Sequence, residues 1–422
     1  MAFVIKTAKT LRNNWKKSTF FAVVLTWGGS YTKNHFETQS LMRQYSEKAA
    51  EYGHQTIPVT VKPRNITVVL NPNANKRKAQ AEFDKYCAPL LHLAGISLDI
   101  VKTESEGHAK ELVENLNGAE AIVVAGGDGT LSDVVTGLLR RTNKNASSLV
   151  PVGVLPLGKN NTVSQTLFPG SSKLEKVKSL ADATMAVIEE VTKPIDVMKI
   201  EILNEESKKP VYAVAGIKWG AYRDAEVKKE SYWYFGGFKK YATYLFNGLK
   251  SSLSWNCEAQ LLYSPPCDGC SNCYKVQNTQ PKSRWFQNFI KENDDNIKYQ
   301  RIHNPSCNEQ LEKKISTSDL MLFTSNVIPS RIQDSETPKL NLFIGPDSVD
   351  YLEFVKQGWK SEKGENREVK ESIEARTIEI NPEKKTDKVL WFSIDNEDYE
   401  VKPIRVTLLP KILKIYVKSE NV

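Results

Sequence analysis

The sequence predicts an α/β fold: an N-terminal domain built on a parallel sheet, followed by a C-terminal β-sandwich domain. Short apolar runs at 65–70, 98–101, 122–125 and 150–155 each end in a polar or glycine-rich loop, and a helical pattern follows. Repeated strand, loop and helix units favour a parallel sheet whose ligand-binding loops lie at the carboxyl ends of the strands. Beyond Pro194, eight short strand-like runs follow one another, with clear helical patterns only at 232–251 and 348–357. Such a run of strands is typical of a β-sandwich.

Length and composition are those of a soluble globular protein of two domains. The chain has 422 residues, of which 26% are charged and 40% hydrophobic. Its net charge of +8 is modest and spread along the chain, which suits an anionic membrane surface or nucleotide phosphates. We expect no nucleic-acid partner. We divide the chain into a targeting segment with a linker helix at 1–57, an α/β domain at 58–193 and a β-rich domain at 194–422.

The first of these segments combines positive charge with a short apolar run. Five basic residues and no acidic one lie in 1–17, and Phe20–Trp27 is almost wholly apolar before the chain is expected to loosen at Gly28-Gly29. A polar helix is then expected from Thr32 to Gln55. The apolar run is shorter than the ~20 residues that span a bilayer, and it favours an interfacial anchor or an uncleaved targeting segment. The alternatives are a secretory signal and a buried helix of the globular part.

The most informative loop is Gly126-Gly127-Asp128-Gly129-Thr130, between an apolar strand and an amphipathic helix. Glycines let backbone amides approach an anion, and a helix N-terminus adds unpaired N–H groups and a positive dipole. Asp128 is the ionisable group of this turn and is placed to bind Mg²⁺ through water or to act as a base. The loop matches neither a Walker A motif nor a dinucleotide fingerprint. An ordinary glycine turn with a solvated Asp is the alternative.

Three further loops follow the neighbouring strands, and each also has a simple structural explanation. Asn71-Pro72 leads into a basic stretch with Lys76 and Lys78, which is either a phosphate loop or a basic surface loop. Thr103 opens the next helix and, with Glu106 three residues later, would form a capping box. The fourth strand ends in 157–162, which contains Gly158, Lys159 and Asn161.

The second half of the chain holds two further candidate elements. Trp219–Asp224 is followed by an aromatic stretch at 232–238, whose rings either line an acyl pocket or, more commonly, belong to the core. Near the end, Asp395-Asn396-Glu397 closes a strand in an acidic turn that is either functional or a plain hairpin.

A polar insertion at 264–314 contains Cys267, Cys270 and Cys273. Cys-x-x-Cys spacing can chelate zinc, with Cys307 or His303 as a further ligand, but no second spaced pair is present. A mobile loop with exposed thiols is therefore the default interpretation.

Taken together, these loops resemble the diacylglycerol kinase catalytic-domain family, which includes sphingosine kinases and bacterial lipid kinases. Gly-Gly-Asp-Gly-Thr is the signature nucleotide loop of that family, and the resemblance extends from Asn65 to Leu409. It implies a lipid kinase fold whose N-terminal parallel-sheet domain binds ATP. The residues implied at the nucleotide are Asn71, Lys76, Thr103, Gly126, Gly127, Gly129, Thr130, Gly158, Asn161 and Lys239.

The resemblance also assigns chemical roles. It implies Asp128 as the base, Asp395 and Glu397 as the metal ligands and alternative catalytic groups, and Asp224 at the lipid head group. This sequence replaces family glycines with Asn75, Arg77 and Asn396, and Trp233 stands where sphingosine kinases often carry an Arg. Asn tolerates left-handed backbone, so the loop shapes are expected to survive.

Within the family, the basic N-terminus and the Trp-Gly-x-x-Arg-Asp and Tyr-Trp-Tyr elements resemble a mitochondrial branch that acts on acylglycerols. That implies Mg²⁺-dependent transfer of the ATP γ-phosphate to monoacylglycerol and diacylglycerol. It also implies attachment to the mitochondrial inner membrane, facing the intermembrane space, and a second role with carrier translocase subunits. A soluble sugar or NAD kinase and a non-catalytic membrane assembly protein on a kinase fold remain alternatives.

Overall fold

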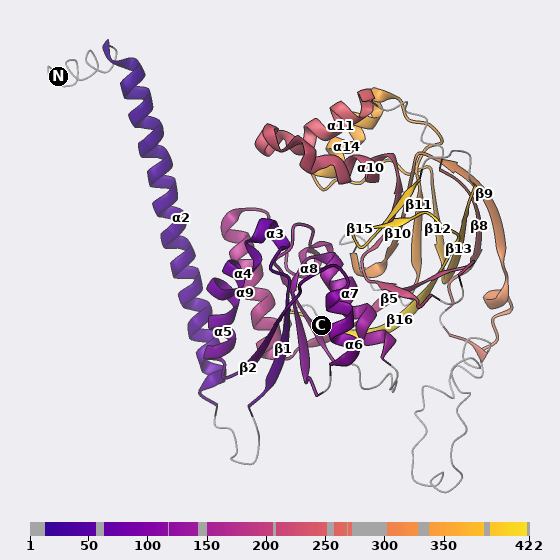
Figure 1. The fold of residues 1–422 in the computed structure, drawn as a ribbon, viewed down its shortest axis with the longest axis horizontal. Coiled ribbons are helices and arrows are strands. Elements are labelled where there is room, and N and C mark those ends of the chain that lie inside the picture. The colour runs from indigo at the N-terminus through magenta and orange to yellow at the C-terminus, as the bar shows by residue number, and fades with distance from the viewer. Residues whose placement is uncertain are drawn as a thin grey trace, which may run out of the picture.

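In the computed structural model the chain forms two sheets: a ten-stranded sheet with strands from both halves of the sequence and a six-stranded sheet with strands from the second half (Figure 1). The structure describes residues 13–55, 63–116, 118–141, 150–205, 208–250, 257–267, 269–271, 302–327, 337–383 and 389–419. Lys6, Lys9, Arg12, Cys273 and most of the insertion at 264–314 therefore lie outside the described residues.

The predicted parallel sheet is confirmed, in the strand order β2-β1-β3-β4. Its strands are β1 (Asn65–Leu70), β2 (Ser97–Lys102), β3 (Ala121–Gly126) and β4 (Val152–Pro156). Every side chain of β3 is buried, because helices cover both faces of the sheet. The loops that follow these strands therefore share one edge, as the sequence predicted.

Two helical layers enclose this sheet. One face packs on α2 (Trp15–Gly53), α4 (Ala79–Glu82), η1 (Phe83–Cys87), α5 (Ala88–Leu93) and α9 (Lys173–Glu189). The other packs on α6 (His108–Asn115) and α7 (Asp128–Arg140), while α3 (Ala74–Arg77) and α8 (Thr162–Leu167) lie in loops at the carboxyl edge. The stretch from α4 to α5 is helical as expected, but it contains a π-helical turn next to Pro89, whose ring removes a backbone donor.

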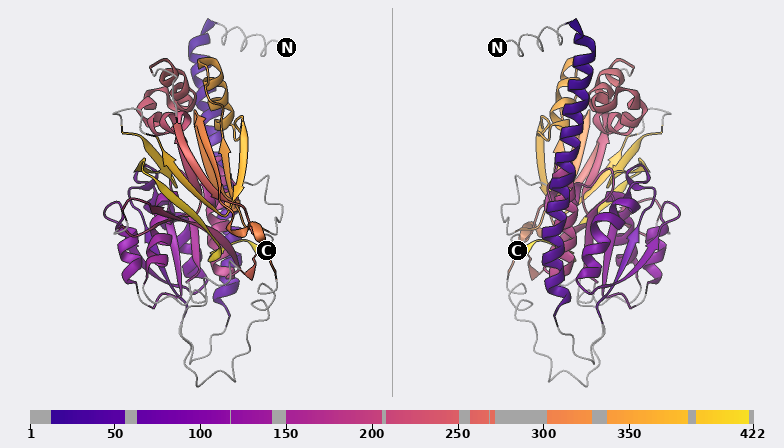
Figure 2. Two further views of the ribbon diagram at one scale, coloured as in Figure 1. Left: turned by 90° about the vertical axis from the view of Figure 1, so that its right-hand side faces the viewer. Right: turned by 90° about the vertical axis from the view of Figure 1, so that its left-hand side faces the viewer.

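The N-terminal segment differs from its prediction. Residues 15–53 form one continuous helix, with no loosening at Gly28-Gly29. Its C-terminal half packs on α5 and α9, whereas its first half extends beyond the α/β layer (Figure 2). Phe20, Leu25 and Trp27 are 65%, 73% and 71% exposed, so the alternative of a buried globular helix is wrong for this stretch. None of the described helices combines the length and the apolar character needed to cross a bilayer.

The second half forms the predicted β-sandwich, whose two sheets bury a shared core that includes Trp219, Leu261 and Leu342. One layer contains β5 (Thr192–Ile202), β6 (Val211–Ala213), β8 (Cys257–Ser264), β9 (Leu311–Thr317), β13 (Thr377–Pro382) and β16 (Ile404–Tyr416). The other contains β7 (Gly216–Gly220), β10 (Asp319–Thr324), β11 (Leu340–Ile344), β12 (Glu371–Ala375), β14 (Trp391–Ile394) and β15 (Glu397–Glu400). Short 3-10 turns η4 (Pro305–Asn308) and η5 (Ser325–Val327) flank this core.

Strand β16 joins the two halves of the molecule. It pairs in parallel with β4 through Ile415 and Val152, and along most of its length it pairs antiparallel with β5. The parallel sheet and one layer of the sandwich are therefore a single ten-stranded sheet. The β14–β15 turn belongs to the other sheet, where β14 pairs with β7.

A helical cap lies over one end of the sandwich (Figure 1). It contains α10 (Ala221–Val227), η3 (Lys228–Phe238), α11 (Lys239–Lys250) and α14 (Tyr351–Glu362). The single helix expected at 232–251 is interrupted at Gly236, where φ is 56°. The core interpretation of the aromatic stretch is wrong for Trp233, Tyr234 and Phe238, which are 72%, 62% and 74% exposed.

Candidate active site

The loops after β1, β3 and β4 are hydrogen-bonded to one another. The Asn71 side-chain amide donates to Thr130 Oγ1 at 3.2 Å, and the Asp128 N–H donates to the Asn160 carbonyl at 3.0 Å. Asn161 closes its own turn by exchanging hydrogen bonds with the backbone of Gly158. A Cβ at Gly158 would lie 2.2 Å from Gly127 Cα, so this contact between the two loops requires glycine. The sequence-predicted loops thus form one rigid edge.

Asp128 lies inside this edge and is only 3% exposed. Its Oδ2 accepts hydrogen bonds from the Thr162 N–H at 2.9 Å, the Thr162 hydroxyl at 2.7 Å and the Asn396 amide at 2.8 Å. Its Oδ1 has a long contact of 3.5 Å with the Val163 N–H. Asn396 comes from the distant end of the chain, so the Asp128 carboxylate joins both halves of the molecule while one of its oxygens is held loosely.

Asp395 and Asn396 form the two-residue turn of the β14–β15 hairpin. Both have positive φ, 46° and 66°, as a tight hairpin of this kind requires. Asn396 therefore keeps the backbone shape expected of the family glycine, and the plain-hairpin interpretation is correct as well. Asp395 is buried, and its oxygens accept from the N–H groups of Val214, Ala215 and Gly216 at 2.8–2.9 Å. Burial raises the pKa of Asp395 to about 7, with the backbone hydrogen bonds opposing it.

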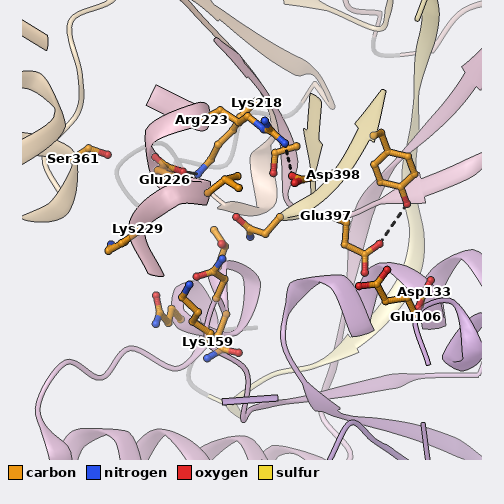
Figure 3. Close-up of a pocket in the computed structure, with 18 of the residues that line it drawn as sticks. Glu106, Asp133, Lys159, Lys218, Arg223, Glu226, Lys229, Ser361, Glu397 and Asp398 are labelled. Carbon is orange, nitrogen blue, oxygen red and sulfur yellow. Dashed lines mark hydrogen bonds and ion pairs between the residues drawn. The ribbon is translucent and has the colours of Figure 1, made fainter. Parts of the chain in front are cut away.

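The turn brings Glu397 into a cleft of about 940 Å³ between the nucleotide loops and the β-sandwich (Figure 3). Its walls include residues of the β4–α8 loop, β7, α10, β14 and β15. The cationic side chains of the cleft are Lys110, Lys159, Lys218, Arg223 and Lys229. Carboxylates line it as well, and those of Glu226, Asp398 and Glu362 pair with Lys218, Arg223 and Lys229. A polyphosphate could take the place of these carboxylates at the cations.

Three carboxylates gather at one end of the cleft. Glu397, Asp133 and Glu106 lie side by side in Figure 3, and all three also line a smaller neighbouring pocket. Burial raises the pKa of Glu397 to about 7, and the nearby Asp133 carboxylate adds to the effect. Burial also raises the pKa of Asp133, with Lys110 opposing it. These hard oxygen donors are of the type that Mg²⁺ prefers, but in this structure their oxygens do not all lie within 4.8 Å of one another, so the side chains must move together to hold one ion.

Sequence reasoning missed Asp133 and Glu106. The signal for Asp133 was its spacing, because it lies four residues after Gly129 and hence on the same face of α7. For Glu106 the sequence predicts only a capping box with Thr103. The helix there begins instead at His108, with Gly107 as its N-cap, so that box is not formed.

The smaller pocket, of about 260 Å³, collects the other residues predicted at the nucleotide. Asn71, Thr103 and Thr130 line it together with Glu397. The Thr103 N–H bonds the Leu70 carbonyl at 2.9 Å, which keeps the β1 and β2 loops adjacent. This pocket adjoins the carboxylate end of the cleft.

A third pocket, of about 660 Å³, contains the predicted lysines. Lys76 and Lys239 line it with Gly158 and Asn161. Glu230 lies among these cations, 2.6 Å from Lys239, 2.9 Å from Lys159 and 4.0 Å from Lys76. Hydrogen bonds from Lys239 and Lys159 lower the pKa of Glu230 to about 2. Lysines from three segments thus surround one anionic group.

The loop that carries Lys76 has left-handed backbone at Asn75 and Arg77, where the resemblance implies glycine. Asn75, Lys76 and Arg77 all have positive φ, of 49°, 58° and 65°. The left-handed conformation expected of Asn75 is confirmed, and it extends over its two neighbours. Such backbone costs about 1 kcal/mol per non-glycine residue, so surrounding contacts must hold it.

Asp224 is not among the residues that line the cleft. Its carboxylate pairs with the Arg223 guanidinium at 2.9 Å, and Arg223 lines the cleft together with Glu226 and Val227 of the same helix. Arg223 also pairs with Asp398 of β15, so this cation connects α10 to the acidic hairpin. The role of Asp224 at the lipid head group stays a prediction.

The fold and this cleft define a class of protein, the ATP-dependent lipid kinases built on a diacylglycerol kinase catalytic domain. The model of the diacylglycerol kinase catalytic domain matches residues 65–200, and that of the acylglycerol kinase C-terminal region matches 214–422. A crystal structure of a diacylglycerol kinase from Bacillus anthracis shares the fold, with a TM-score of 0.50 and 17% identity. It matches over 86% of this chain and 100% of its own.

More similar relatives narrow the class. The chain is 36% identical to the mitochondrial acylglycerol kinase of Homo sapiens, over 97% of this chain and 95% of that protein. The Mus musculus counterpart is 35% identical over the same shares of both chains. Sphingosine kinase 1 of Homo sapiens is 30% identical over only 41% of this chain and 46% of its own. The chain belongs to the acylglycerol kinase family.

Proposed function

We propose that this lipid kinase transfers the γ-phosphate of ATP to the free hydroxyl of monoacylglycerol and diacylglycerol, giving lysophosphatidic and phosphatidic acid. The observation that carries the proposal is the cleft itself. There the Asp395–Glu397 hairpin contacts the glycine loop after β3 beside a polar space lined by lysines, an arginine and carboxylates, three of which (Glu106, Asp133 and Glu397) gather at one end. A polyphosphate with its metal ion needs cations and hard oxygen donors of this kind close together.

The nucleotide would lie along the edge formed by Asn71, Thr103, Thr130 and Gly158, with its phosphates toward Lys159 and Lys239. Glu397, with Asp133 and Glu106, would hold Mg²⁺, and a bound ion there neutralises phosphate charge. We assign Asp395 to positioning of the hairpin rather than to the metal, because backbone amides occupy both of its oxygens. Of the two expected metal ligands, Asp395 and Glu397, only Glu397 then keeps that role.

Asp128 is the group we assign to the acceptor hydroxyl. Thr162 and Asn396 line the cleft and bond its Oδ2, so the carboxylate lies directly behind the cleft wall. Oδ1, which has only the 3.5 Å contact with the Val163 N–H in the described part of the chain, is the atom free to accept a proton. An aspartate is a weak base, so orientation of the hydroxyl supplies much of its effect.

The lipid would reach this site from a membrane surface. Trp233, Tyr234 and Phe238 form an exposed aromatic surface next to the cleft-lining Val227 and Lys229. Exposed aromatic side chains beside cations are typical of protein surfaces at a lipid interface. The apolar stretch of α2 supplies a second attachment.

We further propose that the protein is attached to the mitochondrial inner membrane, facing the intermembrane space, and that it has a second role as a carrier translocase subunit. The exposed apolar half of α2 and the mitochondrial names of the relatives support the attachment. Protease protection of mitochondria and mitoplasts tests it, since cleavage only after the outer membrane is opened is expected. The second role is tested by import of carrier proteins into mitochondria whose only copy of this protein is the Asp128→Asn variant. Normal carrier import is expected. A defect as large as that of mitochondria lacking the protein would contradict a role that is independent of catalysis.

The direct test of the enzymatic proposal is transfer of ³²P from ATP to a lipid panel in mixed micelles. Monoacylglycerol, diacylglycerol, sphingosine and ceramide are offered separately, with NAD and glucose as soluble controls. Label on the two acylglycerols is expected. Label on sphingosine or NAD alone would contradict the substrate assignment, and ATP binding without transfer to any acceptor would favour a non-catalytic assembly protein.

A further inference from the structure

Three cysteines meet at the base of the polar insertion between β8 and β9. Cys267 and Cys270 follow β8, whereas Cys307 lies in η4 just before β9. Their sulfur atoms all lie within 4.8 Å of one another. Cys270 and Cys307 are 0% and 1% exposed, so the cluster is inside the protein rather than on its surface. The exposed-thiol interpretation is therefore wrong for these two residues.

We propose that Cys267, Cys270 and Cys307 bind a structural Zn²⁺ ion. A Zn–S bond of about 2.3 Å places the sulfurs of a tetrahedral site about 3.8 Å apart, so the observed cluster needs a contraction of about 1 Å at most. Three thiolates define three corners of the tetrahedron. The fourth corner is left to a solvent molecule, because the ring nitrogens of His303, the other ligand expected from the sequence, do not lie within 4.8 Å of all three sulfurs.

The local backbone is shaped for such a site. Between the first two cysteines, Gly269 has a φ of 111°, a conformation that favours glycine and that turns Cys270 back beside Cys267. The two arms are then joined by a hydrogen bond of 2.9 Å from the Ser271 N–H to the Ile302 carbonyl. Cys307 reaches the same point because the Asn304 side chain caps η4, accepting from the Ser306 N–H at 3.1 Å.

Hydrogen-bond donors point at the sulfurs. The Asn304 amide donates to Cys267 Sγ at 3.4 Å, and the Arg376 guanidinium donates to Cys307 Sγ at 3.1 Å and to the Cys307 carbonyl. A cation beside a thiol favours the thiolate, which is the form that binds metal. Such donors to ligand sulfur also orient the ligands of metal sites and spread their negative charge.

The proposed ion would close the neck of the insertion. Residues 272–301 lie between Cys270 and Cys307 in sequence, while β8 and β9 pair directly from Cys257 with Thr317 to Tyr263 with Leu311. Arg376 links the neck to the rest of the sheet, because its N–H bonds the Ser264 carbonyl at 2.9 Å. Binding releases the thiol protons and holds both arms to this edge of the sandwich.

The test uses the full-length chain, purified without an affinity tag that binds metal and without added zinc or chelator. Inductively coupled plasma mass spectrometry is expected to find about one zinc per chain. Cys270→Ser and Cys307→Ser should each reduce this at least tenfold. The matched control is Cys257→Ala, a buried cysteine of β8 outside the cluster, which should keep its zinc.

A second measurement guards against variants that fail to fold. In the wild-type chain, replacement of the ion by Co²⁺ should produce the sulfur-to-metal charge-transfer absorption of tetrahedral thiolate sites, and the three cysteines should resist alkylation until a chelator is added. A wild-type chain that stays metal-free after incubation with equimolar Zn²⁺ would overturn the proposal. So would zinc retained by both serine variants, or a native disulfide among the three cysteines found by mass spectrometry. None of these readouts depends on kinase activity.

Discussion

Adding one methyl group at Gly129 tests whether Glu397 is needed at its observed position. Gly129 lies in the first turn of α7, and a Cβ there would be 2.5 Å from Glu397 Oε1 and 3.0 Å from its Cδ and Cγ. Ordinary contacts between carbon atoms are about 3.5–4.0 Å, so Gly129→Ala must displace the carboxylate by about 1 Å. The obstructing atoms are the end of a flexible side chain, so the helix itself need not move.

The effects of Gly129→Ala on stability and on catalysis are expected to separate. Alanine in place of glycine stabilises a helix by up to about 1 kcal/mol, which offsets the cost of moving Glu397, so the free energy of unfolding should change little. A displacement of about 1 Å at a catalytic group costs roughly 10²-fold in rate. We therefore expect kcat to fall by roughly 10²-fold and the Mg²⁺ concentration for half-maximal rate to rise.

The assay is the initial rate of ³²P transfer to monoacylglycerol across a range of ATP and Mg²⁺ concentrations, with urea denaturation alongside. Gly28→Ala is the matched control, because a Cβ there meets nothing within 4 Å and the residue is also helical. It should keep the wild-type rate. A folded Gly129→Ala protein with wild-type kcat and Mg²⁺ dependence would refute the assignment of Glu397.

Three further predictions concern the hairpin, its titration and the membrane surface. Asp395→Ala removes the acceptor of three buried N–H groups and should lower the free energy of unfolding by about 3 kcal/mol or more. Asp395→Asn should cause a smaller loss. Equal stability of the wild type and both variants in urea would contradict this role of Asp395. Because the pKa of Glu397 is raised from 4.5 to about 7, the folded state retains a proton that the unfolded chain releases in that window, so this group lowers stability as pH rises through it. In EDTA, Glu397→Gln should therefore gain on the order of 2 kcal/mol relative to wild type between pH about 5 and pH about 8, and a pH-independent difference would count against the raised pKa. Trp233→Ser combined with Phe238→Ser should reduce sedimentation with anionic vesicles at least tenfold while ATP binding is unchanged, because burial of each aromatic side chain in a lipid interface contributes about 2 kcal/mol. Leu93→Ser, at an exposed apolar residue of α5, is the control. Equal sedimentation of the double variant and the control would exclude a membrane role for the aromatic surface.

Local sequence signals were sufficient to predict the parallel sheet and the loops that follow its strands. The apolar runs that became β1, β3 and β4 and the glycines after β3 follow from short-range patterns, and so does the hairpin shape at Asn396. The continuity of α2 through Gly28-Gly29 could not be read in this way, because a local glycine penalty of about 1 kcal/mol per residue was outweighed over a helix of 39 residues.

The details of the site depend instead on contacts between distant parts of the chain. Asp395 bonds the backbone of Ala215, 180 residues away, so neither its burial nor its occupied oxygens has a signal in the turn sequence. Asn396 reaches Asp128 across 268 residues for the same reason, because its turn follows β14, which pairs with the distant strand β7. Asp133 is the exception, since its helical spacing from Gly129 was visible and its significance became clear only when Glu397 was placed beside it.

Transfer of phosphate to an acylglycerol hydroxyl next to Asp128 is the step on which the other assignments depend. The most direct measurement is ³²P transfer from ATP to monoacylglycerol by wild type and Asp128→Asn in parallel, with ATP affinity and urea stability determined for both. Asp128→Asn keeps the size of the side chain but replaces the carboxylate, which accepts hydrogen bonds from Thr162 and Asn396, with a neutral amide. We expect labelled lysophosphatidic acid from wild type, and a rate at least 10³-fold lower from a folded variant that still binds ATP. Label formed at the wild-type rate by Asp128→Asn would contradict the account.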